Sequence, residues 1–447
     1  MSEDGDVYAW GNTRWYGGTE AHRASAARGV PVKLRNLPKA IMAACGSNFS
    51  AVVCENGSLW TWGLDLGTGH ARVETMPTEI PQQTFSSAVA MIACGSTHAV
   101  ALTVTGRVWT CGNGDDGALG HGDEESMAFK RLEPLTPFVC TMVATGDFHS
   151  IVLQDDGTMW TFGAGLRGQL GHGRYQSRNT PQRVAGDFCD EGETVEMITA
   201  GGAHSAAITT AGSLWTWGSG VCGELGVERV WGLRMDKCTP HHVTMPHSVG
   251  TDLSNQVLSI SCGPFHSLIL KRNGSLWGCG QNTNFEIEPR SMTGHRQELD
   301  YVFTPLALGA NFATTKFASV YATFHASSAV DDQGRVWHWG DGILSGVDFP
   351  GVGGIIIRRL GKRIGRCHDL PEEHALALCM QGVERLSLRD DTPARHMRDC
   401  IDNGCVLRHI VLPMCKKWPE GEAGRRLRGM PGLLRLLGGL LVRHGFM

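Results

Sequence analysis

One unit of about 50 residues recurs along this chain, and it constrains the fold more than any other feature. The unit begins with a small residue and glycine, continues through an apolar stretch and a turn, and ends with an aromatic pair and a glycine-rich loop. The copy from Cys94 to Gly122 shows every part. The first aromatic of the pair recurs at steps of 49, 51, 55, 62 and 60 residues, at Trp60, Trp109, Trp160, Trp215, Trp277 and Trp337. Four short apolar segments per unit of this length are typical of one β-propeller blade.

The interior of each unit indicates short antiparallel strands. Asn56-Gly57, Asp156-Gly157 and Asn273-Gly274 are two-residue hairpin signals, and Ser213–Trp217 alternates between faces. A second recurring position follows the small residue and glycine. It holds an aromatic or histidine side chain, at Phe49, His98, His149, His204, His266 and His325. One histidine per unit at the same position predicts a structural role in each blade rather than a metal or catalytic site.

The two ends of the chain predict how the propeller closes. Asp4–Gly11 matches the second half of a unit, Asn56–Gly63, and His374–Gly382 matches the first half, His98–Gly106. Six whole units and this split unit predict an all-β, seven-bladed β-propeller over residues 1–382, in which N-terminal and C-terminal strands complete one blade. Such pairing removes the open sheet edges of the last blade.

These residues resemble the regulator-of-chromosome-condensation (RCC-type) repeat family. The most specific part is the Gly-x-Leu-Gly-His-Gly loop joined to an aromatic strand, seen best at 109–122 and 160–173. The resemblance implies a seven-bladed propeller with split-blade closure, and the founding member of the family is a guanine-nucleotide exchange factor for a Ran-like small GTPase. Several units depart from the pattern. The loop at 64–70 is shortened, and Gln281–Asn284 has no loop glycine.

Residues 383–447 lack the repeat and are basic, with 12 Lys/Arg against 7 Asp/Glu, although the whole chain has a net charge of −4. We expect a C-terminal extension there, without assigning it a fold, and no specific nucleic-acid binding. Its cysteines and histidines have spacings that fit no zinc finger, so no metal is predicted at His396, Cys400, Cys405, His409 and Cys415. Fifteen cysteines without a C-x-x-C pair favour the cytoplasm or nucleus, and no apolar run is long enough for a transmembrane segment.

Motifs of catalysis and cofactor binding are weak or missing. Gly163–Gly168 matches a dinucleotide fingerprint, but Leu-Gly-His-Gly follows it and would end the helix that a nucleotide site needs. The acidic pairs Asp155-Asp156 and Asp331-Asp332 fall in or beside hairpins, where solvated turn residues are expected. We therefore predict no enzyme activity, no cofactor and no metal.

The enlarged connections between units are the remaining functional signal. Units swell between Gly226 and Ser261 and between Glu286 and Val320, and extra residues between blades should emerge as surface loops that bind partners. The predicted partner-binding residues are Trp231, Arg229, Arg234, Arg290 and Arg296. The sequence favours a monomeric, non-catalytic scaffold or adaptor for protein partners. The alternatives are an exchange factor for a Ran-like small GTPase and a targeting module for a catalytic domain on another chain.

Overall fold

The computed structural model describes most of the repeat region and little of the C-terminal part of the chain. The described residues are 5–9, 32–63, 66–70, 73–122, 126–184, 193–228, 235–245, 256–283, 286–287, 299–306, 315–323, 326–340 and 358–359. The chain divides into two compact units, and all described strands belong to the first, which spans 1–348 and 353–364. Residues 365–447, including the cluster of cysteines and histidines, lie outside the described residues.

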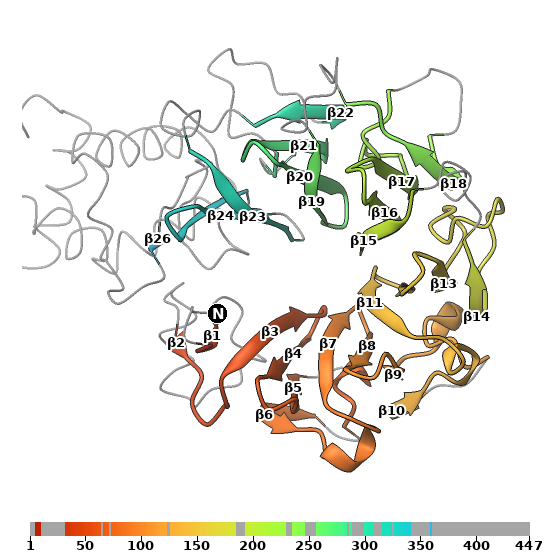
Figure 1. Ribbon diagram of the computed structural model, residues 1–447, viewed down its shortest axis with the longest axis vertical. Helices are drawn as coiled ribbons and strands as arrows, with labels where there is room; N and C mark the ends of the chain where they lie inside the picture. The colour runs from red at the N-terminus through yellow and green to blue at the C-terminus, as the bar shows by residue number, and fades with distance from the viewer. Residues whose placement is uncertain are drawn as a thin grey trace, which may run out of the picture. The chain divides into compact units, whose positions relative to one another are not determined.

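The described strands form six four-stranded antiparallel sheets, and each sheet is one blade of a β-propeller (Figure 1). In chain order the strands of blade 1 are β3 (Ala40–Cys45), β4 (Phe49–Cys54), β5 (Leu59–Gly63) and β6 (Glu74–Glu79). Those of blade 2 are β7 (Val89–Cys94), β8 (His98–Thr103), β9 (Val108–Gly112) and β10 (Ser126–Arg131), and those of blade 3 are β11 (Cys140–Thr145), β12 (His149–Gln154), β13 (Met159–Gly163) and β14 (Arg178–Arg183).

Blade 4 contains β15 (Val195–Ala200), β16 (His204–Thr209), β17 (Leu214–Gly218) and β18 (Lys237–His242). Blade 5 contains β19 (Val257–Cys262), β20 (His266–Lys271), β21 (Leu276–Gln281) and β22 (Leu299–Pro305), and blade 6 contains β23 (Phe317–Ala322), β24 (Ala326–Asp331), β25 (Arg335–Gly340) and β26 (Arg358–Arg359). The helices of the described part are 3₁₀ turns of three residues, at Leu66–Thr68, Gln82–Thr84, Asp115–Gly117 and Glu133–Leu135.

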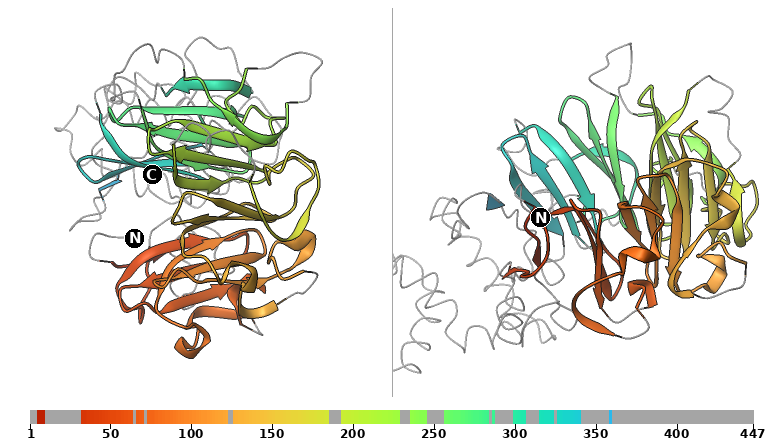
Figure 2. Two further views of the ribbon diagram at one scale, coloured as in Figure 1. Left: turned by 45° about the vertical axis from the view of Figure 1, so that its right-hand side comes forward. Right: turned by 60° about the horizontal axis from the view of Figure 1, so that its bottom comes forward.

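Consecutive blades pack face to face through apolar side chains. The first strands of neighbouring blades contact one another, as do the second strand of one blade and the first strand of the next. Figure 2 shows the sheets from two other directions, each facing its neighbour. The apolar clusters span blade boundaries, as where Ile151 and Leu153 of blade 3 meet Ile198 and Trp217 of blade 4. The alternation of strands such as Leu214–Gly218 thus builds the core between sheets rather than within one.

The structure describes six complete blades, not the seven predicted from the sequence. Where the N-terminal half of a split blade was predicted, the structure has a two-stranded sheet of β1 (Tyr8–Ala9) and β2 (Val32–Lys33). Leu34 N donates to Val7 O at 2.8 Å, as Ile80 N donates to Leu59 O at 2.8 Å in blade 1. The other half of the split blade was predicted at His374–Gly382, which lies outside the described residues, so a seventh sheet is not seen.

The strand register corrects one predicted repeat position. In blade 6, Ala326 pairs with Gly340 in the register in which His266 pairs with Gly280 in blade 5. Ala326 therefore occupies the histidine position, and the prediction of His325 there was wrong by one residue. The error arose because His325 happens to stand next to the true position; His325 itself lies outside the described residues.

Candidate protein-interaction face

All turns between first and second strands, and all loops between third and fourth strands, emerge at the same end of their blades, which we call the loop face. Backbone hydrogen bonds tie the two kinds of loop together within a blade, for example Ala164 N to Phe148 O at 2.8 Å. Others cross between blades, with Ser96 N donating to Asp147 O at 3.0 Å and Asp147 N donating to Gly202 O at 3.2 Å. Hydrogen bonds therefore connect the loops of the loop face within and between blades, which suits this surface to presenting side chains in fixed positions.

A polar contact is repeated at four blade boundaries beneath the loop face. The histidine of one blade contacts a serine of the next through its Nε2 atom, at 2.8–3.0 Å: His98–Ser150, His149–Ser205, His204–Ser267 and His266–Ser327. Each serine hydroxyl in turn donates to a loop carbonyl of the preceding blade, on Ala118, Gln169, Glu224 and Glu286 respectively. Because the serine proton is used on the carbonyl, the histidine must be the donor, which fixes the neutral tautomer with hydrogen on Nε2.

Burial keeps these histidines neutral. Burial lowers the pKa of His98 to about 4 and those of His149 and His204 to about 3, and neighbouring histidines lower that of His149 further. The Nδ1 atoms of these three residues are buried and have no hydrogen-bond partner in the described structure. A second ring proton would thus lack an acceptor, so geometry and pKa agree on a neutral, structural imidazole.

Glycine is required beside each of these rings. A Cβ atom added at Gly146 would lie 2.1 Å from His149 Cε1 and 2.4 Å from Gly201 O. The glycine before the histidine therefore lets the ring lie on the backbone and lets neighbouring blades approach. These contacts explain why each repeat begins with a small residue followed by glycine, a pattern that the sequence alone leaves unexplained.

The first boundary replaces the polar pair by an apolar one. Phe49 of blade 1 stands at the histidine position, and the serine position of blade 2 holds Ala99. Both are buried in one cluster with Cys111, whose thiol lies 3.5 Å from Gly67 O. The two changes occur together because a phenyl ring cannot donate to a serine, so a buried hydroxyl there would lose its partner.

The loop face of blades 3 to 5 carries four exposed apolar side chains. Phe148 is 44% and Phe265 is 37% exposed in turns between first and second strands, and Leu166 is 66% and Val221 is 53% exposed in loops between third and fourth strands. In blade 2 the matching loop position of Leu166 holds Asp115, an exposed carboxylate. The fold does not require apolar residues at these sites, so the loop-face patch of Phe148, Leu166, Val221 and Phe265 is the candidate binding surface.

The partner-binding residues predicted from the sequence all lie outside the described residues: Trp231, Arg229, Arg234, Arg290 and Arg296. The strands on either side of these segments are described. Segment 229–234 connects β17 to β18, and segment 288–298 connects β21 to β22, so both leave from the loop face. The interpretation of 226–261 as one insertion was wrong, because β18 and most of β19 lie within it.

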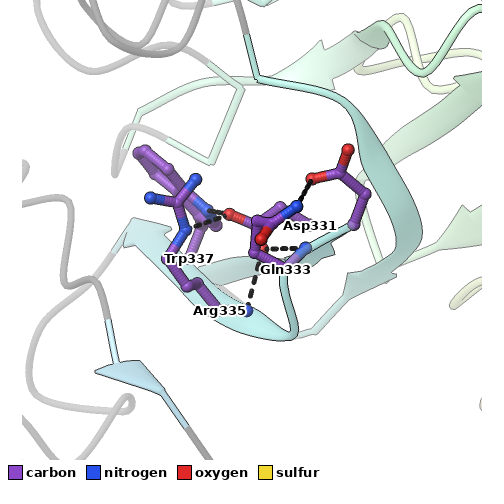
Figure 3. A network of polar contacts seen from close by, with 5 residues as sticks. Asp331, Gln333, Arg335 and Trp337 are labelled. Atoms are coloured by element: carbon purple, nitrogen blue, oxygen red, sulfur yellow. Dashed lines mark hydrogen bonds and ion pairs between the residues drawn. The ribbon is translucent and has the colours of Figure 1, made fainter.

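Two other sequence signals are structural. Gly163–Gly168 leads into turns rather than a helix, and Gly168 lies against blade 4, where an added Cβ would be 2.6 Å from Lys237 O. Asp331 is not the solvated turn residue that the sequence suggested, since it is 2% exposed. Its carboxylate accepts from the backbone N–H groups of Gln333 and Arg335, from Arg335 Nε at 2.6 Å and from Trp337 Nε1 at 2.9 Å (Figure 3). Burial opposes its ionisation, but these bonds leave its pKa below the usual value.

The described side chains contain no group of three or more His, Cys, Asp or Glu arranged to hold a metal ion. Within the same part of the chain, no helix has the length and apolar character needed to cross a membrane.

The six described sheets define a repeat β-propeller, and its loop face is the candidate surface for protein interaction. The chain belongs to the RCC1-like domain family, whose sequence model matches residues 64–347. It is 31% identical over 287 residues to the mitochondrial RCC1 domain-containing protein RUG3 of Arabidopsis thaliana, covering 60% of this chain and 62% of that protein. It is 29% identical to the probable E3 ubiquitin-protein ligase HERC6 of Homo sapiens, covering 61% of this chain and 25% of that protein. The chain thus spans less than two thirds of these relatives.

Among solved structures, Prp20p from Saccharomyces cerevisiae matches with a TM-score of 0.65 and 24% identity, covering 80% of this chain and 86% of that one. This likeness shows the shared propeller fold. Prp20p itself is a protein with binding properties to Gsp1p and histones.

Proposed function

We propose that this protein is a non-catalytic scaffold that binds protein partners through the loop face of blades 3 to 5. The observation that carries the proposal is the loop-face patch, in which four large apolar side chains are exposed on a hydrogen-bonded, rigid surface. Val221 and Phe265 of the patch lie on blades 4 and 5, from which the enlarged segments 229–234 and 288–298 leave. Exposed apolar anchors held by a rigid scaffold, with variable loops beside them, are typical of protein-binding surfaces.

Replacing Leu166 and Val221 by serine is expected to lower partner binding at least about tenfold, because central apolar contacts dominate the affinity of such interfaces. The melting temperature should change little, since both side chains are more than half exposed. Affinity capture from cell lysate with quantitative mass spectrometry measures the first effect, and thermal unfolding measures the second.

The matched control is Val104→Ser with Val139→Ser. These valines are 65% and 46% exposed and lie at the other ends of their blades, in a hairpin and before a first strand. Partners that bind the loop face should be retained by the control and lost by the Leu166 and Val221 variant. Equal retention by both variants would exclude the loop-face patch as the binding site.

The second candidate function is nucleotide exchange on a Ran-like small GTPase. The RCC-type repeats and the fold shared with Prp20p support it, although no exchange residue can be matched in this chain. An exchange factor holds its GTPase tightly without nucleotide and releases it when nucleotide binds. A small GTPase captured with EDTA, and released by magnesium and excess GTP, would favour exchange over the scaffold function.

We also infer that a seventh, split blade closes the propeller. Gly5 accepts from Ala40 N at 2.8 Å, as Gly57 accepts from Val89 N at 3.0 Å, so the N-terminal segment contacts blade 1 as blade 1 contacts blade 2. The other half is inferred from the sequence repeat alone, in which His374–Gly382 matches His98–Gly106.

Deleting residues 1–9 is expected to lower the melting temperature by roughly 10 °C, because Val7 and the backbone partners of Leu34 and Ala40 are lost. Deleting only residues 1–4 is the control, since these precede the contacts. An unchanged melting temperature after deletion of residues 1–9 would contradict the split-blade closure.

A further inference from the structure

Positive charge is concentrated where blades 3 and 4 meet at the outside of the propeller. Residues 164–184 contain four arginines and no acidic residue, although the chain as a whole is negative. We define the cationic rim as Arg167, Arg174, Arg178, Arg183 and Lys237. Arg167, Arg174 and Arg183 are exposed, and Arg178 and Lys237 are half-buried.

The centre of the rim brings two cationic residues onto neighbouring chain segments. Gly173 N donates to Cys238 O at 2.7 Å, and the hydroxyl of Tyr175 donates to Asp236 O at 3.0 Å. These bonds flank Arg174 on one segment and Lys237 on the other, so the two residues lie on adjacent segments where blades 3 and 4 meet. The neighbouring carboxylate, Asp236, is 4% exposed, lies 3.6 Å from Arg167 and accepts from Gly220 N at 3.2 Å.

Matched positions in other blades show that the fold does not require these cations. Arg178 and Lys237 pair with the last glycine of their third strands, Gly163 and Gly218, and the same position in blade 1 is Glu74. Arg183 pairs with Trp160, and its counterpart in blade 1 is the exposed Glu79. The same backbone position therefore accepts either charge. Neighbouring like charges that serve no structural purpose cost stability, and an anionic ligand would offset that cost.

We propose that the cationic rim binds an acidic segment of a partner protein that also carries apolar residues. Two features favour a protein over nucleic acid. Leu166 is 66% exposed and Tyr175 is 37% exposed beside the cations, so an apolar side chain can pack there. The net charge of −4 also repels a long polyanion, whereas a short acidic segment meets only the local positive charge.

Binding to the full chain can be measured by fluorescence anisotropy with a labelled 12-residue peptide of alternating glutamate and leucine. A peptide with glutamine in place of glutamate has the same apolar residues without the charge. The glutamate peptide is expected to bind at least about tenfold more tightly at 50 mM salt, and this advantage should shrink at 500 mM salt because exposed charges are screened. Equal binding of the two peptides would overturn the proposal.

The decisive variant is Arg174→Glu with Lys237→Glu, which should weaken the glutamate peptide at least about tenfold. The control, Arg272→Glu with Lys316→Glu, makes the same change of charge at an exposed cation of the β20–β21 hairpin in blade 5 and at one just before β23 of blade 6. These residues are not on blades 3 and 4, so the change should alter binding less than about twofold. Equal losses in both variants would mean that total charge, not the rim, attracts the peptide. The variant Arg174→Gln with Lys237→Gln removes the two charges without reversing them, and its peptide affinity shows the effect of that loss. Thermal unfolding checks that this variant remains folded.

Two further probes separate other anions from the acidic segment. The probes are a 12-nucleotide single strand of DNA and vesicles containing phosphatidylserine. The proposal would be overturned if either probe bound more tightly than the glutamate peptide and if the Arg174→Glu and Lys237→Glu variant abolished that binding. Because Leu166 belongs to the loop-face patch and also lies beside the rim, the peptide test uses only the charge variants at Arg174 and Lys237. Partner capture by the Leu166 and Val221 variant tests the loop-face patch separately, since it does not use the peptide.

Discussion

Lowering the pH from 7.5 to 5.0 is expected to reduce the free energy of unfolding by about 5 kcal/mol. Burial lowers the folded pKa of His98 and His338 to about 4 and that of His149 and His204 to about 3, from the ordinary value of 6.5. The unfolded chain therefore binds their protons first, so their stabilising effect is full above pH 6.5 and is lost as the pH falls towards 4. Glu224 acts in the opposite direction, because burial raises its pKa to about 7 and it keeps a proton that the unfolded chain releases. Four histidines outweigh one carboxyl group. Urea unfolding followed by tryptophan fluorescence measures the difference.

A variant built on the first blade boundary provides the control. His204→Phe with Ser267→Ala copies the Phe49 and Ala99 pair at the one His–Ser boundary where the neighbouring third-strand residue is also cysteine, Cys279 in place of Cys111. The double variant should stay folded at pH 7.5 and should lose about 2 kcal/mol less than the natural protein on acidification. Each single variant leaves a buried polar group without its partner, so each should cost about 1–3 kcal/mol at pH 7.5. Unchanged pH dependence in the double variant would show that these histidines do not control acid stability.

Gly146→Ala is expected to destabilise the protein by about 3 kcal/mol or more, because the new methyl group meets a buried ring and a carbonyl that cannot both move. Its Cβ would lie 2.1 Å from His149 Cε1 and 2.4 Å from Gly201 O. Gly122→Ala is the control, since Gly122 has a φ of +85° but nothing within 4 Å of an added Cβ. That variant should cost only about 1 kcal/mol, the penalty for left-handed backbone in alanine. Thermal unfolding at pH 7.5 compares the two, and equal losses would show that backbone strain, not contact between blades, explains the glycine.

The sequence predicted the blades well because each depends on local patterns. The hairpin at Asp156-Gly157, the alternating strand at Leu214–Gly218 and the recurring Trp60 position all appear in the expected strands. Tyr8–Ala9, the described strand within Asp4–Gly11, pairs with Val32–Lys33, and its place in a seventh blade stays a prediction. These features follow from neighbours in sequence, so one unit compared with the next is sufficient to find them.

Features that depend on contacts between units were missed. Ser150 lies directly after a recognised histidine, but its partner, His98, belongs to the preceding unit. The signal was available in the joint change of Phe49 and Ala99, two residues 50 positions apart. The burial of Asp331 was missed because its partner Trp337 reaches it across the hairpin. Exposure of Phe148 and Leu166 could not be inferred from their residue types, which usually indicate a core.

The His–Ser contact gives each blade two distinct sides. At its histidine position, a blade presents a hydrogen-bond donor or an apolar ring to the following blade. At its serine position, it presents a matching hydroxyl or methyl group to the preceding blade. Blade 2 offers Ala99 backward and His98 forward, so it fits only after a blade like blade 1 and only before a blade like blade 3. Exchanging two whole repeats would therefore break contacts even if each repeat folded well. The side chains at the blade boundaries therefore restrict which blades can be neighbours, in addition to the backbone connections that set the order of the blades.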